Sequence, residues 1–331
     1  MEIKNNQLRD RAKCSDIVTD EEYKSFNDEN TSIVEEFLEN SAHLSKQSIK
    51  QYESALRIFL KFIKDKLNDK PIFDISKREF LKYMTMLQNR GLSSGGLKLK
   101  KSAVSSLVNY IETFVVEDDE KYKSFRNFTK GLPSITANKV YEKVKISKEE
   151  YDKVVDKLLK EEKYMQLCWW VIAFNTGARK GELLQFKSEL HNYKIEEGKT
   201  SVDTHTIRGK GRGEEGKPLK YMLNKECLEY IKLWLENREY EHEFLFTTKY
   251  KGVVKQISSG WANMFCSNTL TPYFGRRINP HITRASSATY LMEQGVDIAK
   301  ISKHVLHHES LEVSQRYLIR DDDEDKNSIY K

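Results

Sequence analysis

Apolar residues recur every three or four positions in the segment 45–64, SKQSIKQYESALRIFLKFIK. Side chains at this spacing share one face of a helix, so the pattern predicts an amphipathic helix. Its apolar face comprises Ile49, Tyr52, Leu56, Phe59 and Ile63. Its opposite face is basic and includes Lys46, Lys50 and Arg57.

Two more helices are predicted in the first half of the chain. The motif SKRE opens one of them with a capping box of Ser76 and Glu79, and Gly91 ends it. The next helix should run from about 97 to 114 and begins LKLKKS. Lysines in its first turns oppose the helix dipole, which favours an anionic partner for them. These lysines are Lys98, Lys100 and Lys101.

The pattern changes in the second half. Residues 136–146 have little periodicity and are predicted to form a linker. A second capping box, Ser147 and Glu150, then opens a helical region, interrupted between about 195 and 223 by a Thr-, Val- and Gly-rich stretch typical of short strands. Helices are expected again over 224–237 and on to the end. The chain is therefore predicted to be mainly α-helical, with an acidic leader (1–30), a small helical domain (31–135), the linker, and a larger helical domain (147–331) containing a small antiparallel sheet.

Composition narrows the class of protein. The chain has 331 residues, of which 38% are hydrophobic and 32% charged, enough for two cores. The longest apolar run, residues 167–174, is far shorter than the ~20 residues of a membrane span. No signal-like segment begins the sequence, and the four cysteines show no disulfide or metal-ligand spacing. We therefore expect a cytoplasmic protein without a membrane segment.

Charge is unevenly distributed along the chain. Residues 1–42 hold 5 Lys/Arg against 11 Asp/Glu, a net charge of −6, whereas residues 46–139 hold 19 against 10, a net charge of +9. A basic domain suggests a polyanionic partner, because neutralising phosphates releases counterions. An ordinary solvated, lysine-rich surface explains the composition equally well.

Four segments contain residues suited to phosphate chemistry. The sequence FNTGARKGEL (174–183) ends an apolar helix at a glycine and presents Arg179, with Glu182 three residues later. In NPHITRASSATYLMEQG (279–295), His281 and Arg284 share one helical face, and arginine can bind phosphate through two donors. Lys210 lies in a glycine-rich hairpin, IRGKGRGEEGKPLKY. Tyr317 follows His308 by nine residues and would need neighbouring cations to act as a nucleophile.

Other chemistries have weaker support. His304, His307 and His308 are spaced to bind zinc, but no nearby carboxylate or cysteine completes a ligand set, so we expect no metal. The chain contains no G-x-x-x-x-G-K-[ST] motif, which argues against nucleotide hydrolysis.

Taken in their order along the chain, which is Arg179, the Lys210 hairpin, the His281–Arg284 helix and the segment ending at Tyr317, the four segments together resemble the tyrosine site-specific recombinases of the phage integrase family. The resemblance covers the second domain, and the basic segment from about 30 to 135 is similar to the family's SAM-like core DNA-binding domain. It implies that double-stranded DNA is the partner and that Lys46, Lys50, Arg57, Lys98, Lys100 and Lys101 contribute to binding it. It also implies a catalytic set of Arg179, Lys210, His281, Arg284, His308 and Tyr317.

The same resemblance implies a mechanism. The two arginines would hold the scissile phosphate, Lys210 would protonate the leaving oxygen, and Tyr317 would form a 3′-phosphotyrosine. The reaction would need no cofactor, and the family acts as tetramers on paired sites.

The sequence departs from the family pattern in three places. The usual LGH is LHH here, so His308 is preferred to His307 because of its distance from Tyr317. Ala285 follows Arg284, where the family often has histidine. The 14 residues after Tyr317 include the acidic run 321–325, which would repel DNA. Two alternatives to a recombinase of a phage or mobile element therefore stay open: a DNA-binding regulator of the repressor type that has lost strand exchange, and a metal-dependent nuclease.

Overall fold

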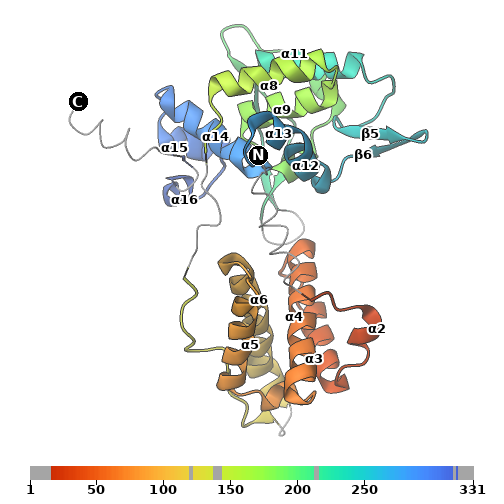
Figure 1. The fold of residues 1–331 in the computed structure, drawn as a ribbon. Coiled ribbons are helices and arrows are strands. Elements are labelled where there is room, and N and C mark those ends of the chain that lie inside the picture. The colour runs from red at the N-terminus through yellow and green to blue at the C-terminus, as the bar shows by residue number, and fades with distance from the viewer. Residues whose placement is uncertain (1–15, 119–121, 137–143, 212–215, 316–317, 320–331) are drawn as a thin grey trace, which may run out of the picture. The chain divides into compact units, whose positions relative to one another are not determined.

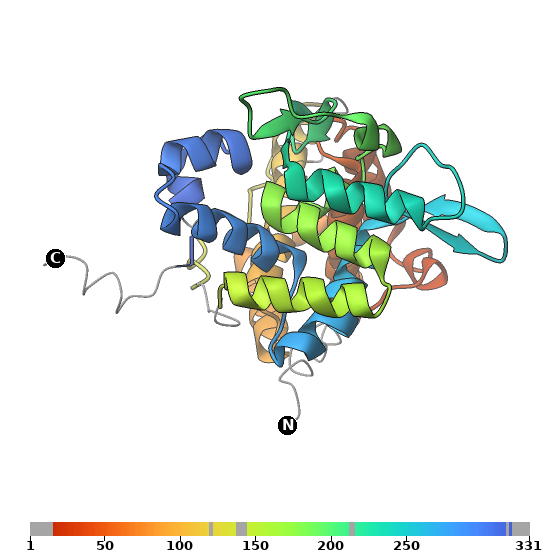
Figure 2. The same ribbon diagram turned by 90° about the horizontal axis from the view of Figure 1, so that it is seen from above.

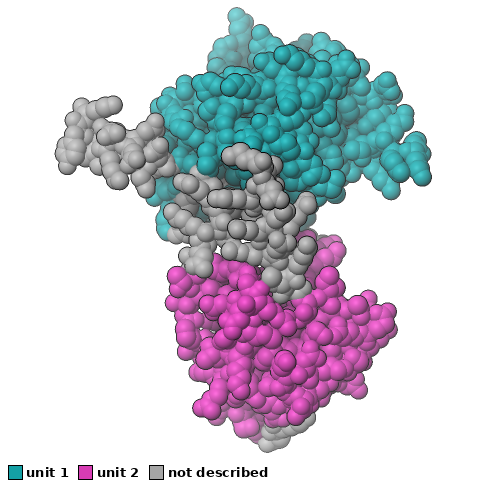
Figure 3. All heavy atoms as spheres, in the orientation of Figure 1, with its two compact units in different colours: residues 1–3, 142–211, 215–331 teal, residues 4–141, 212–214 magenta. Residues whose placement is uncertain are grey.

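The computed structural model describes residues 16–118, 122–136, 144–211, 216–315 and 318–319. They form two compact units, coloured separately in Figure 3: an N-terminal unit up to residue 136 and a C-terminal unit from residue 144. Each unit has its own hydrophobic core. Most of the predicted linker, residues 137–143, lies outside the described residues. Within the described ranges, no helix is long and apolar enough to cross a membrane.

The N-terminal unit is entirely helical in its described part (Figure 1). Its elements are α2 (Asp20–Tyr23), α3 (Asp28–Glu39), α4 (Lys46–Leu67), the 3-10 helix η1 (Ile72–Asp74), α5 (Lys77–Asn89), α6 (Ser94–Tyr110), the π-helix η2 (Ile111–Val115) and α7 (Val116–Asp118). The amphipathic helix predicted at residues 45–64 is confirmed as α4, and its apolar face is buried against α6. The capping box that we predicted at the start of α5 is present.

The acidic segment expected to end at residue 30 packs into the N-terminal unit. Tyr23 and Phe26 are buried in its core. Asn30 is fully buried and donates through Nδ2 to the carbonyl of Lys70 at 3.0 Å, while its Oδ1 accepts from the backbone N–H of Ile72 at 2.7 Å. These bonds fix α3 to the chain beyond α4, so residue 30 marks no break in the packing.

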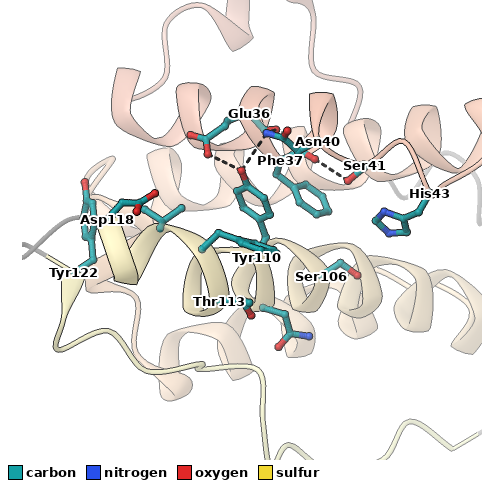
Figure 4. A pocket seen from close by; sticks show the side chains of 13 residues that line it. Glu36, Phe37, Asn40, Ser41, His43, Ser106, Tyr110, Thr113, Asp118 and Tyr122 are labelled. Carbon is teal, nitrogen blue, oxygen red and sulfur yellow. Dashed lines mark hydrogen bonds between the residues drawn. The ribbon is translucent and has the colours of Figure 1, made fainter.

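A hollow of about 760 Å³ lies between α3 and the α6–η2 region of the N-terminal unit (Figure 4). Tyr110 spans it, since its hydroxyl donates to Glu36 at 2.6 Å and accepts from Asn40 Nδ2 at 3.1 Å. The hydrogen bonds hold the two helices together at the rim of the hollow.

The C-terminal unit is built around one buried helix. Its α-helices are α8 (Lys148–Lys160), α9 (Tyr164–Thr176), α10 (Lys180–Leu183), α11 (Lys225–Glu236), α12 (Ser259–Phe265), α13 (Thr271–Phe274), α14 (Pro280–Glu293), α15 (Ile298–Lys300) and α16 (Leu311–Gln315). A 3-10 helix, η4 (Ser188–Asn192), and the π-helices η5 (Cys266–Leu270) and η6 (Ile301–Val305) complete the helical part. Helix α9 is apolar on all sides and contacts α8, α11 and α14, which lie around it in Figure 2.

In the part of the chain that the structure describes, the strands form three two-stranded antiparallel sheets. Strands β1 (Ser201–Asp203) and β4 (Met222–Asn224) pair, as do β2 (Ile207–Gly209) and β3 (Lys217–Leu219), within the region where strands were predicted. The third sheet, β5 (Thr247–Tyr250) with β6 (Val253–Gln256), projects from its unit as a hairpin in Figure 1. The prediction of a single sheet followed by helices was therefore wrong in this detail, whereas the mainly helical fold class is confirmed.

Candidate functional site

Arg179 lies at a turn that the buried helix α9 holds in place. The helix ends at Gly177, whose backbone is left-handed with φ +61°. An added Cβ there would also lie 2.9 Å from Val305 Cγ1, so the turn favours glycine both for its conformation and for its packing. The next residues lead directly to Arg179, which precedes α10. The end of helix α9 therefore fixes the backbone position from which the Arg179 side chain extends.

Glu182 holds Arg179 from inside the protein. Its carboxylate accepts from the backbone N–H of Arg179 at 2.8 Å and from the Nη1 of Arg179 at 2.9 Å. Only 3% of Glu182 is exposed, and the hydroxyl of the fully buried Tyr221 donates to the same carboxylate at 2.5 Å. Burial and the nearby Glu182 carboxylate raise the pKa of Tyr221, which keeps its proton in this bond. Arg179 is thus preorganised by a carboxylate whose orientation is itself fixed.

Arg284 closes the site from α14. Asn279 caps this helix by accepting from the N–H groups of His281 and Ile282, and Pro280 occupies its first turn. Arg284 is 2% exposed and donates to the carbonyls of Gly177 and Leu306. Its guanidinium therefore joins α14 to the Arg179 turn and to the loop after η6.

His308 completes the group around Arg284. Its Nε2 lies 3.4 Å from Nη2 of Arg284, and its Nδ1 lies 2.9 Å from the hydroxyl of Ser314 on α16. Burial, followed by the positive charges of Arg284 and Arg179, lowers the pKa of His308 to about 4. The imidazole is consequently neutral at physiological pH.

His307 lies beside His308 but faces a different neighbour. Its backbone has a φ of +48°, uncommon for a residue with a side chain, and its ring meets that of Tyr221 edge to face at 4.9 Å. Burial lowers the pKa of His307, and Arg284 lowers it further. Together with His304 and Lys217, both histidines line a pocket of about 410 Å³.

These contacts bring together residues that are far apart in the sequence. The cluster contains two guanidinium groups and one carboxylate, so it carries net positive charge without DNA or any other anion. Such a set is suited to binding an oxyanion, because the donors are fixed before the ligand arrives. We call it the arginine cluster, and it comprises Arg179, Glu182, Tyr221, Arg284, His307 and His308.

The remaining predicted catalytic residues lie as follows. His281 is exposed on the first turn of α14, one turn before Arg284. Lys210 is exposed directly after β2. Tyr317 lies outside the described residues, and α16 ends two positions before it at Gln315. Among the described residues, no group of three or more His, Cys, Asp or Glu side chains could hold a metal ion.

Two residues in or beside the arginine cluster, Tyr221 and Ser314, were not predicted from the sequence. Tyr221 follows a short strand and Ser314 lies in a five-residue helix, and each acts through a hydrogen bond to a residue of another segment. No local motif marks either position, because such contacts depend on the tertiary fold.

The predicted DNA-binding lysines of α4 and α6 divide into two groups. Lys46, Lys50 and Lys98 are exposed and Lys101 is partly exposed. The N-terminal halves of α4 and α6 are adjacent, since the hydroxyls of Tyr52 and Ser102 lie 3.0 Å apart. Four of the six predicted residues thus belong to neighbouring stretches of surface on these two helices.

Lys100 does not fit a DNA-binding role. Helix α6 begins at Ser94 with Ser93 as its cap, three residues earlier than predicted, so the lysines lie beyond the first turn, where the dipole effect is largest. Lys100 falls on the apolar stripe with Leu97 and Val104, is 8% exposed, and has a pKa lowered by burial. Burial argues against a contact with DNA, so we do not include Lys100 in the surface proposed below.

Arg57 is also engaged within the N-terminal unit. Its guanidinium pairs with Asp20 at 2.6 Å and Glu53 at 2.8 Å and lies over the ring of Tyr23, with 4.5 Å between its Cζ and the ring centroid. Two carboxylates offset its charge, so we do not include Arg57 in the surface proposed below.

Protonation of His308 should make the C-terminal unit less stable in mild acid. An unfolded histidine binds a proton near pH 6.5, whereas folded His308 does so near pH 4. The unfolded state therefore binds more protons across this window, and the free energy of unfolding should decrease as pH falls from 6.5 to 4. All four tryptophans (Trp169, Trp170, Trp234 and Trp261) lie in this unit, so their fluorescence follows its unfolding.

The His308→Asn variant should lose part of this pH dependence, and replacing the exposed His43 of the other unit should leave it unchanged. Equal pH slopes for wild type and His308→Asn would contradict the assignment.

Comparison with known proteins identifies the family. Residues 135–324 match the phage integrase family, and residues 32–117 match the phage integrase N-terminal SAM-like domain. The chain is 47% identical over 330 residues to the SPbeta prophage-derived recombinase-like protein YomM of Bacillus subtilis (strain 168), covering 99% of this chain and 98% of that protein. It is 26% identical to the tyrosine recombinase XerA of Pyrococcus horikoshii, covering 72% and 74% of the two chains.

Solved structures show the same fold. The XerH site-specific recombinase bound to a palindromic difH substrate matches with a TM-score of 0.66 at 21% identity, over 100% of this chain and 98% of that chain. The Tn1549 transposon integrase in complex with transposon right end DNA matches with a TM-score of 0.65 at 15% identity, over 90% and 96%. The protein belongs to the phage integrase family, as the order of its motifs predicted.

Proposed function

We propose that the protein is a site-specific tyrosine recombinase that cleaves and rejoins double-stranded DNA for a phage or other mobile element. The observation that carries the proposal is the arginine cluster, in which Arg179 and Arg284 are fixed before any ligand binds. Membership of the phage integrase family and the likeness to a prophage-derived recombinase-like protein support it. The XerH and Tn1549 proteins, which share the fold, were captured on DNA.

The proposed reaction is a transesterification at one phosphate. Arg179 and Arg284 bind its nonbridging oxygens and stabilise the charge that develops in the transition state. The Tyr317 hydroxyl releases its proton to solvent, and its oxygen forms a bond to phosphorus as the bond to the 5′ oxygen breaks. Lys210 gives a proton to that leaving oxygen, and His281 and His308 complete the polar surroundings of the phosphate. One phosphodiester replaces another, so the step requires no nucleotide hydrolysis, and reversal by a second 5′-hydroxyl rejoins the strand.

Strand exchange requires two DNA sites and four active subunits, and we propose a homotetramer on paired sites. A duplex selected from a random library by its affinity for the protein provides the substrate. With a chelator present, cleavage should leave protein attached at the 3′ end and a free 5′-hydroxyl that a kinase can label. Binding without cleavage would indicate the DNA-binding regulator instead, and cleavage that the chelator stops would indicate a metal-dependent nuclease.

The DNA-binding surface of the N-terminal unit is proposed to include Lys46, Lys50, Lys98 and Lys101. The double variant Lys98→Glu with Lys101→Glu should weaken DNA binding at least about tenfold and lower the slope of log K against log salt by about 2, because two phosphate contacts are lost. Fluorescence anisotropy at several salt concentrations measures both effects.

The matched control reverses two exposed lysines of the same unit, Lys66 and Lys82. Its effect on the salt slope should be clearly smaller. Equal losses in the two double variants would place the DNA surface elsewhere. Lys100→Glu is expected to unfold the unit instead, because it buries a carboxylate.

A further inference from the structure

A short relay of hydrogen bonds connects His308 to two buried serines. The hydroxyl of Ser314 lies 2.9 Å from His308 Nδ1 and donates to the hydroxyl of Ser302 at 2.8 Å. Ser314 is fully buried and Ser302 is 4% exposed. The backbone N–H of His308 also donates to the carbonyl of Ser302 at 3.0 Å. Residues from α16, η6 and the loop between them therefore meet at one imidazole.

The partners of the imidazole determine the direction of each bond. A guanidinium can only donate hydrogen bonds, so the contact of Arg284 with Nε2 of His308 requires a lone pair on that nitrogen. A neutral imidazole with a lone pair on Nε2 carries its proton on Nδ1. That proton is donated to Ser314, whose own proton is then directed to Ser302 at 2.8 Å, the nearer of two acceptors, since the carbonyl of Ser310 lies at 3.5 Å. Every bond of the relay has one donor and one acceptor.

We propose that Ser314 is a positioning residue for the DNA cleavage proposed above: it holds His308 in the Nδ1–H form, with the Nε2 lone pair turned toward Arg284. The inference rests on that proposed function for its catalytic meaning. Without the acceptor at Ser314, the Nδ1–H form loses one of its two supports, so the population with the proton on Nε2, facing the N–H groups of Arg284, should rise. Two donors would then oppose each other, and the clamp on the phosphate would lose one of its supports.

The position of Ser314 in the chain links this effect to the nucleophile. Ser314 precedes Tyr317 by three residues, and α16 carries it into the site. Docking of α16 against η6 therefore sets the tautomer of the histidine beside Arg284. Helix α16, which precedes Tyr317 in the chain, thus also orients His308 beside Arg284.

Charge alone does not account for the state of His308. Among the described residues, the charged or titratable groups that act on it include Arg284 of α14, Arg179 before α10, the adjacent His307, and Glu182 of α10. Burial and the cations keep the pKa of His308 at about 4, so the imidazole is neutral at pH 7. Ser314 acts together with Arg284 on which nitrogen carries the proton.

Nitrogen-15 NMR of the full chain with labelled histidine, free of DNA, tests the proposal. His308, assigned from the signal lost in His308→Asn, should show a protonated Nδ1 and an unprotonated Nε2 in wild type. Ser314→Ala should shift the population toward Nε2–H, and Ser314→Thr, which retains the hydroxyl, should restore the wild-type spectrum. Ser287→Ala is the matched control, because this buried serine of α14 has no hydrogen-bond partner for its hydroxyl among the described residues.

An unchanged His308 tautomer in Ser314→Ala would overturn the proposal. Should that variant fail to fold, Ser314→Cys decides, since a thiol is a much weaker acceptor and should also raise the Nε2–H population, and an unchanged spectrum would count against the proposal. In single-turnover cleavage, Ser314→Ala should be slower by about tenfold, the loss expected for one hydrogen bond, and Ser314→Thr should be close to wild type.

The two measurements separate the inference from the proposed function. The tautomer is measured without DNA, so it can be confirmed or refuted even if wild type cleaves no substrate. A cleaving wild type with an unaltered tautomer in the serine variants would refute the role of Ser314 alone.

Discussion

Replacing Arg284 with lysine is expected to reduce the rate of DNA cleavage by about 10²–10³-fold, the usual loss when one fixed donor to a transition-state charge is removed. Arg284 donates to two backbone carbonyls and contacts His308 through one rigid fork. A lysine carries a single, flexible ammonium group and cannot reproduce this geometry. Single-turnover cleavage of the selected duplex at saturating protein measures the effect.

The same substitution should lower the free energy of unfolding of the C-terminal unit by about 1–3 kcal/mol, because a buried carbonyl loses its donor. Arg238→Lys is a suitable control for this loss of stability. Arg238 is also buried and donates to the carbonyls of Tyr240 and Phe244, away from the proposed chemistry. It should destabilise the unit similarly while the cleavage rate of folded protein is retained. Equal rates for the two variants would remove Arg284 from the proposed active site.

Tyr317→Phe should abolish the covalent protein–DNA adduct, with a loss of at least about 10³-fold, since no hydroxyl is left to attack phosphorus. DNA affinity should stay within about twofold of wild type, because phenylalanine retains the ring and removes no charge. A denaturing gel with a nicked duplex measures the adduct, and a native gel measures binding.

The control for this substitution is Tyr250→Phe, which removes the hydroxyl of a largely exposed tyrosine on β5. It should form the adduct at the wild-type level. An adduct that persists in Tyr317→Phe would assign the nucleophile to another residue.

Local signals in the sequence predicted much of the helical fold. The capping boxes of Ser76 with Glu79 and Ser147 with Glu150 are both present, because each is formed within four consecutive residues. The interruption of helices by short strands was also predicted, since Thr, Val and Gly are concentrated there.

The sequence predictions failed at two places where the local signal was weak: the start of helix α6 and the β5–β6 hairpin. The helix start at Ser93 was missed, so three lysines were placed in the first turns of the helix, whereas they lie beyond its first turn and Lys100 is buried. The β5–β6 hairpin was also missed. In the structure its turn residues, Lys251 and Gly252, both have positive φ, as is typical of tight hairpin turns. Its four-residue strands, TTKY and VVKQ, lack the apolar alternation that marks a half-buried strand.

The arginine cluster could be predicted only in part. The order of the motifs indicated Arg179 and Arg284, but the two arginines meet through a contact between segments 107 positions apart. Tyr221 reaches Glu182 across 39 positions, and no spacing within either segment anticipates that bond. Side chains that orient others, such as Tyr221 and Ser314, are determined by tertiary packing and are visible only in the fold.

The central claim is that Arg179 and Arg284 hold a DNA phosphate for attack by Tyr317, and peptide mapping of the covalent complex tests it most directly. The protein is incubated with the nicked, selected duplex, digested with nuclease and protease, and analysed by mass spectrometry. The account predicts a nucleotide attached through a 3′-phosphate to the oxygen of Tyr317. A duplex that the protein binds tightly but never links covalently, or a linkage at another residue, would contradict it.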